Sequence, residues 1–291
     1  MPTRFRLILT PKVIHPLGVP EGSGIGVRAA ILEAVQRLDS ATAGWLHDRP
    51  RLRPYCVTPV MGLDARDPAP YIELGVAVDE LADGFRRVLD ATREIQVGHS
   101  SFHVHDVLQT GAPFRELLAG APIARTWTVR FLAPTTVRTA GPGPARSQPF
   151  PTPESIFGSL ARRWDTFSPV SIPDEVVDAA TSQLCVEEAT VRVEKAKVVP
   201  ERQSPPRRAQ WEKGCVGSVT YTLSGGSRTP GNTLSGISAL VLLGALCGVG
   251  DRTTVGMGVM EPVGLGLQTD RDGSSRATPG TRPARRRAAS D

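Results

Sequence analysis

The sequence contains very little lysine. Lysine occurs at only four positions, Lys12, Lys195, Lys197 and Lys213, although the chain of 291 residues has a formal net charge of +5. The positive charge is therefore carried almost entirely by arginine, which pairs bidentately with phosphate and stacks on bases. A basic, arginine-rich chain favours a polyanionic partner, although a GC-rich gene would produce the same bias.

The sequence also lacks paired cysteines and long apolar runs. Its cysteines, Cys56, Cys185, Cys215 and Cys247, are widely separated and form no CxxC pair. We therefore expect neither a zinc site nor a disulfide framework, and a reducing cytoplasm is the default location. No stretch has the length of a membrane-spanning helix, and the amino-terminal stretch MPTRFRLILT lacks the apolar region of a signal peptide. No membrane contact is expected.

Residues 235–258, SGISALVLLGALCGVGDRTTVGMG, are the most distinctive stretch of the chain. Their first half is apolar on all sides, which predicts a buried helix rather than a surface helix. Gly248 then provides the usual helix stop. The glycine-rich loop that follows carries an arginine and two threonines, which suit phosphate oxygens. A turn that holds a helix against a strand has the same composition.

The loop matches neither of two common nucleotide-binding motifs. A P-loop requires Lys and then Ser or Thr after its last glycine, whereas Met257 follows Gly256. The glycines of a dinucleotide fingerprint lie between a strand and the start of a helix, whereas this loop follows a helix. Both motifs are therefore excluded.

The first part of the chain has the spacing of a strand, helix, strand, strand, helix and strand. Strands are expected at 4–10, near 55–61 and 71–78, and at 101–109; helices are expected at 25–38 and 79–91. A short helical turn at 41–47, with Ser40 as its N-cap, follows the first helix. This order is the ferredoxin-like arrangement.

The same order then starts again. A strand at 126–138, a helix at 154–164, strands near 184–199 and 214–223, and the buried helix follow one another. We therefore expect an α+β fold of two tandem ferredoxin-like (βαββαβ) domains, at 1–120 and 121–265, the second with the glycine-rich loop. Residues 266–291 are almost free of large apolar side chains and are expected to form a disordered, arginine-containing tail.

Three segments resemble the CRISPR-associated (Cas) endoribonucleases of the RAMP superfamily, which cut precursor CRISPR RNA within each repeat. They are WLHDRPRLRPYCVTPV, then RFLAPTTVR with a proline-rich loop and FGSLARRW, and finally GVGDRTTVGMG. The resemblance implies two ferredoxin-like domains with the RNA bound across them and no cofactor. It also implies a metal-independent reaction, in which the ribose 2′-hydroxyl attacks the neighbouring phosphate. The products are a 2′,3′-cyclic phosphate and a 5′-hydroxyl end.

Such a reaction needs groups that remove and return a proton and cations that stabilise the charge at phosphorus. His47 is the candidate for proton transfer, because histidine titrates near neutral pH. Arg49, Arg51 and Arg53 follow at alternating positions and would share one face of an extended segment. By the resemblance, Arg53 stands where some members have a catalytic lysine. His47 and Arg53 are thus the expected catalytic residues, with Arg49 and Arg51 expected to bind RNA.

Two features complicate this assignment. Some family members use a tyrosine in the first helix, where this chain has Leu32 and no tyrosine between 25 and 38. His99, His103 and His105 form a rival cluster, but a metal site would need further ligands. We expect no metal site and interpret these three as surface histidines.

The other expected RNA contacts come from the second domain. They are Arg130 and Arg138, which flank its first strand and turn, and the loop residues Gly248, Gly250, Arg252, Thr253, Thr254, Gly256 and Gly258. Arg162 and Arg163 are expected on the solvated face of a helix whose other face is core. No aromatic stacking motif is present, so recognition would depend on shape, phosphates and arginine.

The sequence thus predicts a metal-independent endoribonuclease that binds and cleaves CRISPR repeat RNA. A second interpretation is a non-cleaving RNA-binding subunit of a Cas interference complex, with other Cas proteins as partners. The departure at Leu32 keeps it open. A third interpretation, a small-molecule enzyme that holds a phosphate in the glycine-rich loop, is disfavoured by the missing Lys-Ser/Thr pair.

Overall fold

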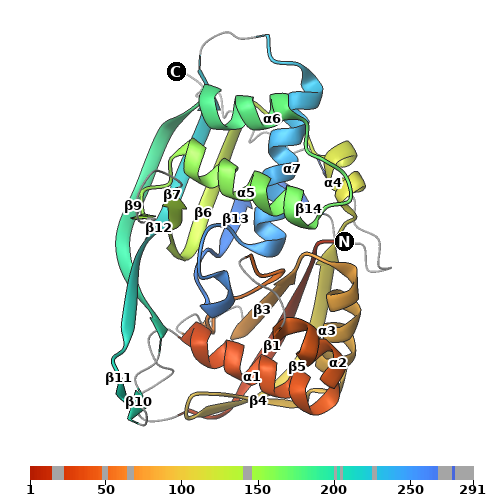
Figure 1. The fold of residues 1–291 in the computed structure, drawn as a ribbon, viewed down its shortest axis with the longest axis vertical. Helices are drawn as coiled ribbons and strands as arrows, with labels where there is room; N and C mark the ends of the chain where they lie inside the picture. Colours follow the sequence, from red (N-terminus) through yellow and green to blue (C-terminus); the bar gives the residue numbers. More distant parts are fainter. Residues whose placement is uncertain are drawn as a thin grey trace, which may run out of the picture.

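The computed structural model describes residues 1–14, 23–47, 52–63, 69–139, 146–199, 202–203, 206–224, 228–267 and 277–278. The chain forms a mixed α+β structure with antiparallel sheets. Two halves, each with its own sheet, are stacked along the long axis of the molecule (Figure 1). The N-terminal half runs to the end of strand β5, and the C-terminal half contains the elements that follow.

The N-terminal half is a five-stranded sheet with three helices. Its strands, in the order β2-β3-β1-β5-β4, are β1 (Thr3–Val13), β2 (Tyr55–Val57), β3 (Tyr71–Val76), β4 (Glu94–Val97) and β5 (Ser100–Gly111). Its helices are α1 (Ser23–Leu38), α2 (Ser40–His47) and α3 (Asp79–Ala91). Burial alternates along β1, where Phe5 and Leu7 are buried in the core and Arg6 lies on the other face. Such alternation is the expected pattern for a strand with one covered face.

The sequence missed one strand here and misplaced one helix cap. Strand β4 was not predicted. Asp39, rather than Ser40, caps α2, because its Oδ1 accepts a hydrogen bond of 2.9 Å from the Thr42 amide, and Ser40 is already inside the helix. This hydrogen bond and the one from Arg87 lower the pKa of Asp39 to about 2.

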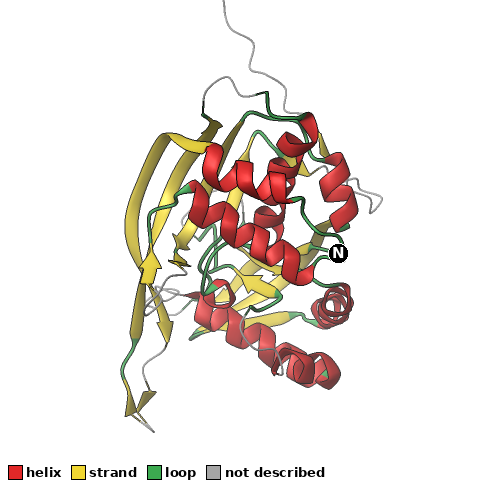
Figure 2. Cartoon of the chain, turned by 45° about the horizontal axis from the view of Figure 1, so that its top comes forward, coloured by secondary structure: helices red, strands yellow, loops and turns green. Residues whose placement is uncertain are grey.

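The C-terminal half is a four-stranded sheet with helices packed on one face (Figure 2). Its strands, in the order β13-β6-β12-β9, are β6 (Thr126–Thr135), β9 (Leu184–Val199), β12 (Gln210–Leu223) and β13 (Met260–Val263). Its helical elements are α4 (Phe114–Gly120), α5 (Pro153–Phe167), α6 (Asp174–Asp178), the π-helix η1 (Ala179–Gln183) and α7 (Gly231–Cys247). The sequence did not predict α4, α6 or η1.

Three small strand pairs and the 3-10 helix η2 (Thr253–Val255) complete the described elements. Strand β7 (Val137–Thr139) pairs with β8 (Arg146–Gln148), β10 (Arg202–Gln203) with β11 (Pro206–Arg207), and β14 (Gly266–Leu267) with β15 (Ala277–Thr278). Strands β9 and β12 run down one side of the molecule, and β10 and β11 at their tip reach the level of α1 (Figure 1). Most of the expected tail, 268–276 and 279–291, lies outside the described residues.

The two sheets share one strand order. When β4 is left out, the first strand of each sheet in chain order lies between the third and the fourth, and the second lies at an edge beside the third. The N-terminal sheet adds β4 outside β5. The order of strands and helices that the sequence predicted for each half is therefore present, with extra elements inserted.

Helix α7 lies at the centre of the molecule. Every residue from Gly236 to Gly244 is buried, which confirms the prediction from the apolar run. The helix contacts α4, α5, α6, β6 and β13 of its own half, and also β1 and β3 of the N-terminal half. Its buried Ser238 hydroxyl accepts a hydrogen bond of 2.9 Å from Trp127 Nε1, so this polar group is satisfied. No helix within the described ranges has the length and apolar character needed to cross a membrane.

Candidate active site

The end of α2 and the segment after it bring two of the predicted site residues together. His47 is the last residue of α2, and Arg53 Nη1 donates a hydrogen bond of 2.7 Å to the carbonyl oxygen of Leu46, directly before it. A cation suits this place, because the last carbonyl groups of a helix have no partner within it and carry partial negative charge. The His47 side chain, and both Arg49 and Arg51, lie outside the described residues.

The backbone around Arg53 is held on two sides. Arg53 precedes Pro54, which disfavours helical backbone at Arg53. The Pro54 carbonyl oxygen accepts a hydrogen bond of 2.7 Å from the Ala77 amide. The carbonyl oxygen of Arg53 itself accepts one of 3.2 Å from Arg163 Nη1, which comes from α5 in the other half. The half-buried Arg53 side chain therefore starts from a fixed backbone.

Arg163 corrects a sequence-based expectation. Arg162 is exposed as expected, but Arg163 has an exposed fraction of only 2%, beside the buried Leu160 and Trp164. The reason is that α5 is covered by α7 and also contacts the N-terminal half through Arg163, so little of its surface faces solvent. A signal was present in the sequence, since Arg163 follows Leu160 by three residues, and residues three apart lie on the same face of a helix.

The loop from Gly248 to Gly258 is bound to the rest of the protein by its own amides. Gly248 N donates to Gly244 O in α7 over 2.8 Å, and Gly250 N donates to Ser159 Oγ in α5 over 3.0 Å. Asp251 N donates to Thr136 O over 2.9 Å, and Gly258 N donates to Pro134 O over 3.1 Å. These four amides therefore have acceptors within the protein and are not directed at a ligand.

Close packing explains why two of the loop residues are glycine. Gly250 and Gly256 have positive φ angles of 78° and 90°. A Cβ atom on Gly250 would lie 2.2 Å from Thr136 O, and one on Gly256 would lie 2.8 Å from the Cα atom of Gly24 in α1. The loop thus packs against both halves: a side chain at Gly250 would displace it from the end of β6, and one at Gly256 would displace it from α1.

Among the polar loop side chains, Arg252 is the exposed one. It is also the only non-glycine residue with a positive φ angle, 58°, in the described part of the chain, and this conformation is uncommon for arginine. Thr254 is half-buried, whereas Thr253 is buried and its methyl group packs near Gly248 and Gly258. Arg252 and Thr254 are therefore loop side chains that a ligand can reach, and Asp251, with an exposed side-chain fraction of 35%, is another.

The structure places the two predicted strand arginines differently. Arg138 Nε lies 2.6 Å from Asp251 Oδ2, so this arginine is attached to the glycine-rich loop. Arg130 is exposed and pairs with Glu261 on β13, with 3.2 Å between Nη1 and Oε1. Its neighbours Val129 and Phe131 are buried under the helices, so Arg130 faces away from α5 and from the contact between Arg163 and Arg53.

No tyrosine takes the place of Leu32, which packs partly buried against the N-terminal core. One turn earlier on α1, Arg28 Nε donates a hydrogen bond of 3.3 Å to the hydroxyl of Tyr55, which is almost fully buried. The spacing of four between Arg28 and Leu32 puts both on one face of the helix, but no local pattern in the sequence indicates the contact of Arg28 with Tyr55.

The rival histidines lie along the β4–β5 hairpin, and His103 and His105 are exposed. His103 Nδ1 lies 3.4 Å from Glu94 Oε1, which also accepts a hydrogen bond of 2.7 Å from Lys12 Nζ. Within the described residues, no group of three or more His, Cys, Asp or Glu side chains is arranged to hold a metal ion.

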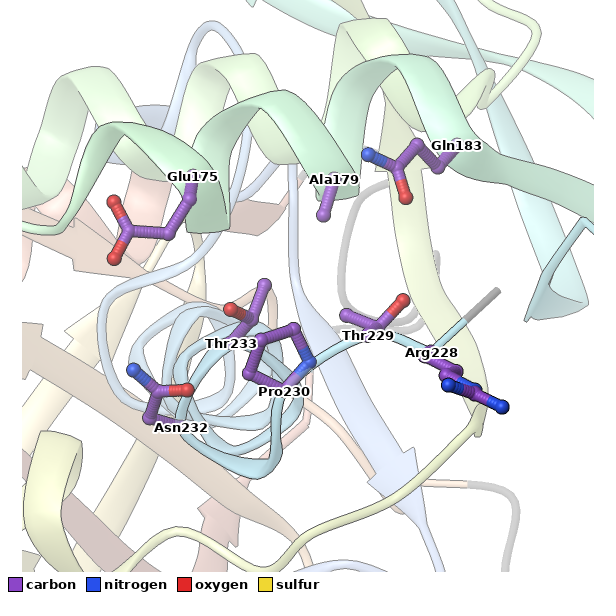
Figure 3. A pocket seen from close by; sticks show the side chains of 8 residues that line it. All are labelled: Glu175, Ala179, Gln183, Arg228, Thr229, Pro230, Asn232 and Thr233. Atoms are coloured by element: carbon purple, nitrogen blue, oxygen red, sulfur yellow. The ribbon is translucent and has the colours of Figure 1, made fainter. Parts of the chain in front are cut away.

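A shallow pocket of about 340 Å³ lies far from these residues, between η1 and the start of α7 (Figure 3). Glu175, Gln183, Asn232 and Thr233 are among the residues that line it. It is at the end of the C-terminal half opposite to α2 (Figure 1). None of the residues predicted as site residues lines it.

Comparison with known proteins identifies what this arrangement resembles. Residues 129–260 match the family model of the CRISPR-associated endoribonuclease Cas6. A solved structure of a Cas6 product complex matches 90% of this chain and 99% of its own, with 25% identity and a TM-score of 0.72. The resemblance seen in the sequence is confirmed.

Other Cas6 structures match with the same coverage of this chain, 90%. Cas6 of Thermus thermophilus is 23% identical over 98% of its length, with a TM-score of 0.66. A Cas6-related protein from Pyrococcus furiosus is 13% identical over 99% of its length, with a TM-score of 0.58. No curated protein matches the sequence.

The two kinds of match to Cas6 cover different parts of the candidate site. The family model begins in β6 and ends at the first residue of β13, so it contains Arg163 and the glycine-rich loop. His47 and Arg53 lie outside that match. For the N-terminal half, the likeness to Cas6 comes from the solved structures.

Proposed function

We propose that this protein is an endoribonuclease that cleaves CRISPR repeat RNA to produce mature CRISPR RNA. The matched family is described as an endoribonuclease, and the similar structures include Cas6 in a product complex and a substrate-mimic complex. The observation in this chain that carries the proposal is the hydrogen bond from Arg53 to the Leu46 carbonyl. It puts a cation beside the residue that carries the proposed proton-transfer group, His47.

The proposed reaction is a transesterification at one phosphodiester. The ribose 2′-oxygen attacks the neighbouring phosphorus and loses its proton to a base, while the bond from phosphorus to the 5′-oxygen breaks and the departing oxygen takes up a proton. The products are a 2′,3′-cyclic phosphate and a 5′-hydroxyl. We assign one of these proton transfers to His47.

Arg53 is proposed to stabilise the negative charge that develops on the phosphate oxygens. A guanidinium group has five N–H donors, and Nη1 uses one of them on Leu46 O. A positioned cation is well suited to a developing negative charge. Because arginine stays protonated, it does not replace the proton-transfer role of a lysine. The proposed reaction uses no metal ion.

We propose that the RNA contacts the exposed side of the glycine-rich loop through Arg252 and Thr254. Arg138, attached to the loop through Asp251, extends this basic surface. We also keep Arg49, Arg51 and Arg130 as proposed RNA contacts, on the basis of the sequence alone. For Thr253 and the four glycines Gly248, Gly250, Gly256 and Gly258, burial and packing support a role in shaping the loop rather than in touching RNA.

The shared strand order supports our interpretation of the halves as tandem ferredoxin-like domains, 1–120 and 121–265, followed by a tail at 266–291. Under this interpretation the RNA lies across both domains. The end of α2 provides the proton-transfer and charge-stabilising groups, and the loop after α7 provides part of the RNA-binding surface.

A cleavage assay with labelled repeat RNA in EDTA tests the proposal. We expect cleavage at one position by the wild-type protein. His47→Ala should lower the rate by about 10²- to 10⁴-fold and leave RNA affinity nearly unchanged. His103→Ala, at an exposed histidine of the β4–β5 hairpin, is the matched control and should cleave normally. Unimpaired cleavage by His47→Ala, or cleavage that disappears in EDTA, would contradict the proposal.

One observation favours a second candidate function. Leu32 stands where some family members have a tyrosine, and the structure offers no exposed phenol on α1 in its place. A non-cleaving RNA-binding subunit of a Cas complex would keep the fold and the loop without a complete site. Tight binding of repeat RNA without any cut in the same assay would support it.

A further inference from the structure

Arg163 is a buried cation with no acidic partner among the described residues. Its exposed fraction is 2%, and the ion pairs found there do not include it. The charge of Arg163 acts to lower the pKa of the Cys56 and Cys247 thiols, but burial has the larger effect and raises both pKa values, that of Cys247 to about 12. Neither thiol therefore supplies a negative charge. Burying a guanidinium group costs free energy, because it loses hydration that its hydrogen bonds within the protein must offset.

The known hydrogen bond of Arg163 crosses the boundary between the halves. Arg163 Nη1 donates to Arg53 O over 3.2 Å, and Arg53 Nη1 donates to Leu46 O over 2.7 Å. Two bonds therefore connect α5 of the C-terminal half to the last turn of α2. That turn ends with His47.

Each end of this connection is firmly supported. Helix α5 has an N-cap hydrogen bond from the Ser155 amide to Thr152 Oγ1, and its Ile156, Phe157 and Leu160 are buried in the C-terminal core. On the other side, Leu46 is buried in the N-terminal core. A side chain that links two rigid bodies restricts their relative position, and at a reaction site errors of about 1 Å can lower the rate by about 10²-fold.

We propose that Arg163 is a positioning residue for the proposed cleavage reaction. It holds the Arg53 peptide, and through it the Arg53 guanidinium group, against the end of α2, so that His47 and Arg53 meet the RNA in one arrangement. This inference rests on the proposed function of His47 and Arg53. It also explains the buried charge, because an apolar side chain of similar length would fill the space without desolvating a cation but would not make the bond.

The first test is single-turnover cleavage by Arg163→Met, which approximately keeps the length of the side chain and removes its donors. We expect the cleavage rate to fall by about 10- to 100-fold while the dissociation constant for repeat RNA changes less than about twofold. Arg162→Ala, at the exposed neighbour on the same helix, is the matched control and should cleave at the wild-type rate. Arg163→Lys keeps one donor and should recover part of the rate.

The second test asks whether Arg163 acts through Arg53. We expect the double variant Arg53→Ala, Arg163→Met to cleave no more slowly than Arg53→Ala alone. Once the Arg53 guanidinium group is absent, the hydrogen bond from Arg163 no longer positions a group that acts in the reaction. Multiplying rate losses would show that the two act independently and would overturn the inference. A wild-type rate in Arg163→Met, or a loss confined to RNA affinity, would overturn it as well.

Amide hydrogen exchange tests the inference without activity. Arg53→Ala and Arg163→Met should each speed exchange in the last turn of α2, with α3 unchanged as an internal reference. If Arg163→Met does not fold, Arg53→Ala and Arg163→Lys decide the matter by the same measurement, and unchanged exchange in both overturns the inference. Failure of the proposed function is distinguishable, because either the wild-type protein would then not cleave the RNA or His47→Ala would cleave it normally, whatever the effect of Arg163→Met on exchange.

Discussion

Helices α3 and α7 occupy equivalent places in their halves, each between the third and the fourth strand of the order that the two sheets share when β4 is left out. Helix α3 buries one face, including Phe85 and Val88, and leaves its acids and arginines in solvent. Helix α7 is buried on every side, because the helices of its own half and strands β1 and β3 of the other half surround it. The same topological position is a surface helix in one half and the common core in the other.

This difference shows where the two halves depend on each other. The loop that follows α7 packs Gly256 against Gly24 of α1, and Arg163 of α5 bonds the segment after α2. The Arg163 bond lies beside the proposed reaction site, and the Gly256 contact holds the start of α1. The C-terminal half therefore acts as the frame against which α1 and α2 are held, and its own chain contributes Arg252 on the same loop.

Leucine truncations give the largest effect that tests the comparison of α3 with α7. Leu242→Ala and Leu243→Ala change adjacent, fully buried positions, and each should cost about 2–5 kcal/mol of unfolding free energy. In α3, Leu89→Ala should cost as much, but its neighbour Asp90→Ala should cost under about 1 kcal/mol, because Asp90 is exposed in a helix ion pair. Urea denaturation measures all four. A small effect at either Leu242 or Leu243 would mean that α7 has a solvated face.

The next largest effect concerns the loop after α7. Gly250 and Gly264 have the same φ angle, 78°, but a Cβ on Gly250 meets Thr136 O at 2.2 Å, and one on Gly264 meets nothing within 4 Å. Gly264→Ala should cost about 1–2 kcal/mol from its backbone conformation, and Gly250→Ala about 1–2 kcal/mol more from the forced displacement. Equal costs in urea denaturation would show that the loop is not tightly packed.

Arg252→Gly should change the stability of the protein and its proposed affinity for RNA in opposite directions. Glycine takes the positive φ angle at this position without strain, so the unfolding free energy should rise by up to about 1 kcal/mol. Affinity for RNA should fall, and the slope of log affinity against log salt should decrease by about one. An unchanged salt slope would remove Arg252 from the proposed interface.

The smallest effect concerns the N-cap of α2. The folded pKa of Asp39 is about 2, below the unfolded value of about 3.9, so its charge stabilises the fold above about pH 4 and this contribution is lost as the pH falls towards 2. Asp39→Asn should therefore lower the Tm at pH 6, and the difference from wild type should shrink as the pH approaches 2. A difference that stays constant with pH would show that the charge of Asp39 is unimportant.

Patterns of burial allowed much of the fold to be predicted from the sequence. The bounds of α3 were predicted correctly because its apolar residues lie at helical spacing. The burial of α7 and its end before Gly248 were predicted from its apolar run, although the helix begins at Gly231, four residues before the predicted stretch. Strand β4 was missed because its four residues are too short for a clear alternation. Helix α4 was missed because it has only seven residues and packs against α7, a contact that no local pattern indicates.

The candidate site was less predictable, because contacts between distant residues define it. The proximity of Arg53 to the end of α2 follows from a hydrogen bond seven residues apart, and the sequence suggested it only through the resemblance. Arg163 lies 110 residues from Arg53, and a helix pattern alone assigned it to solvent. The glycines of the loop looked suited to phosphate, but their partners are Ser159, Thr136 and Gly24, which no local pattern indicates.

Analysis of the RNA ends after cleavage in EDTA tests the central claim most directly. Attack by the 2′-hydroxyl, with proton transfer by His47 and charge stabilisation by Arg53, predicts a 2′,3′-cyclic phosphate on one fragment and a 5′-hydroxyl on the other. Replacing the 2′-hydroxyl at the cut position by hydrogen should then abolish cleavage while the RNA still binds. Fragments that carry a 5′-phosphate and a 3′-hydroxyl, or cleavage of the deoxy substrate, would show that water is the nucleophile and would contradict this account.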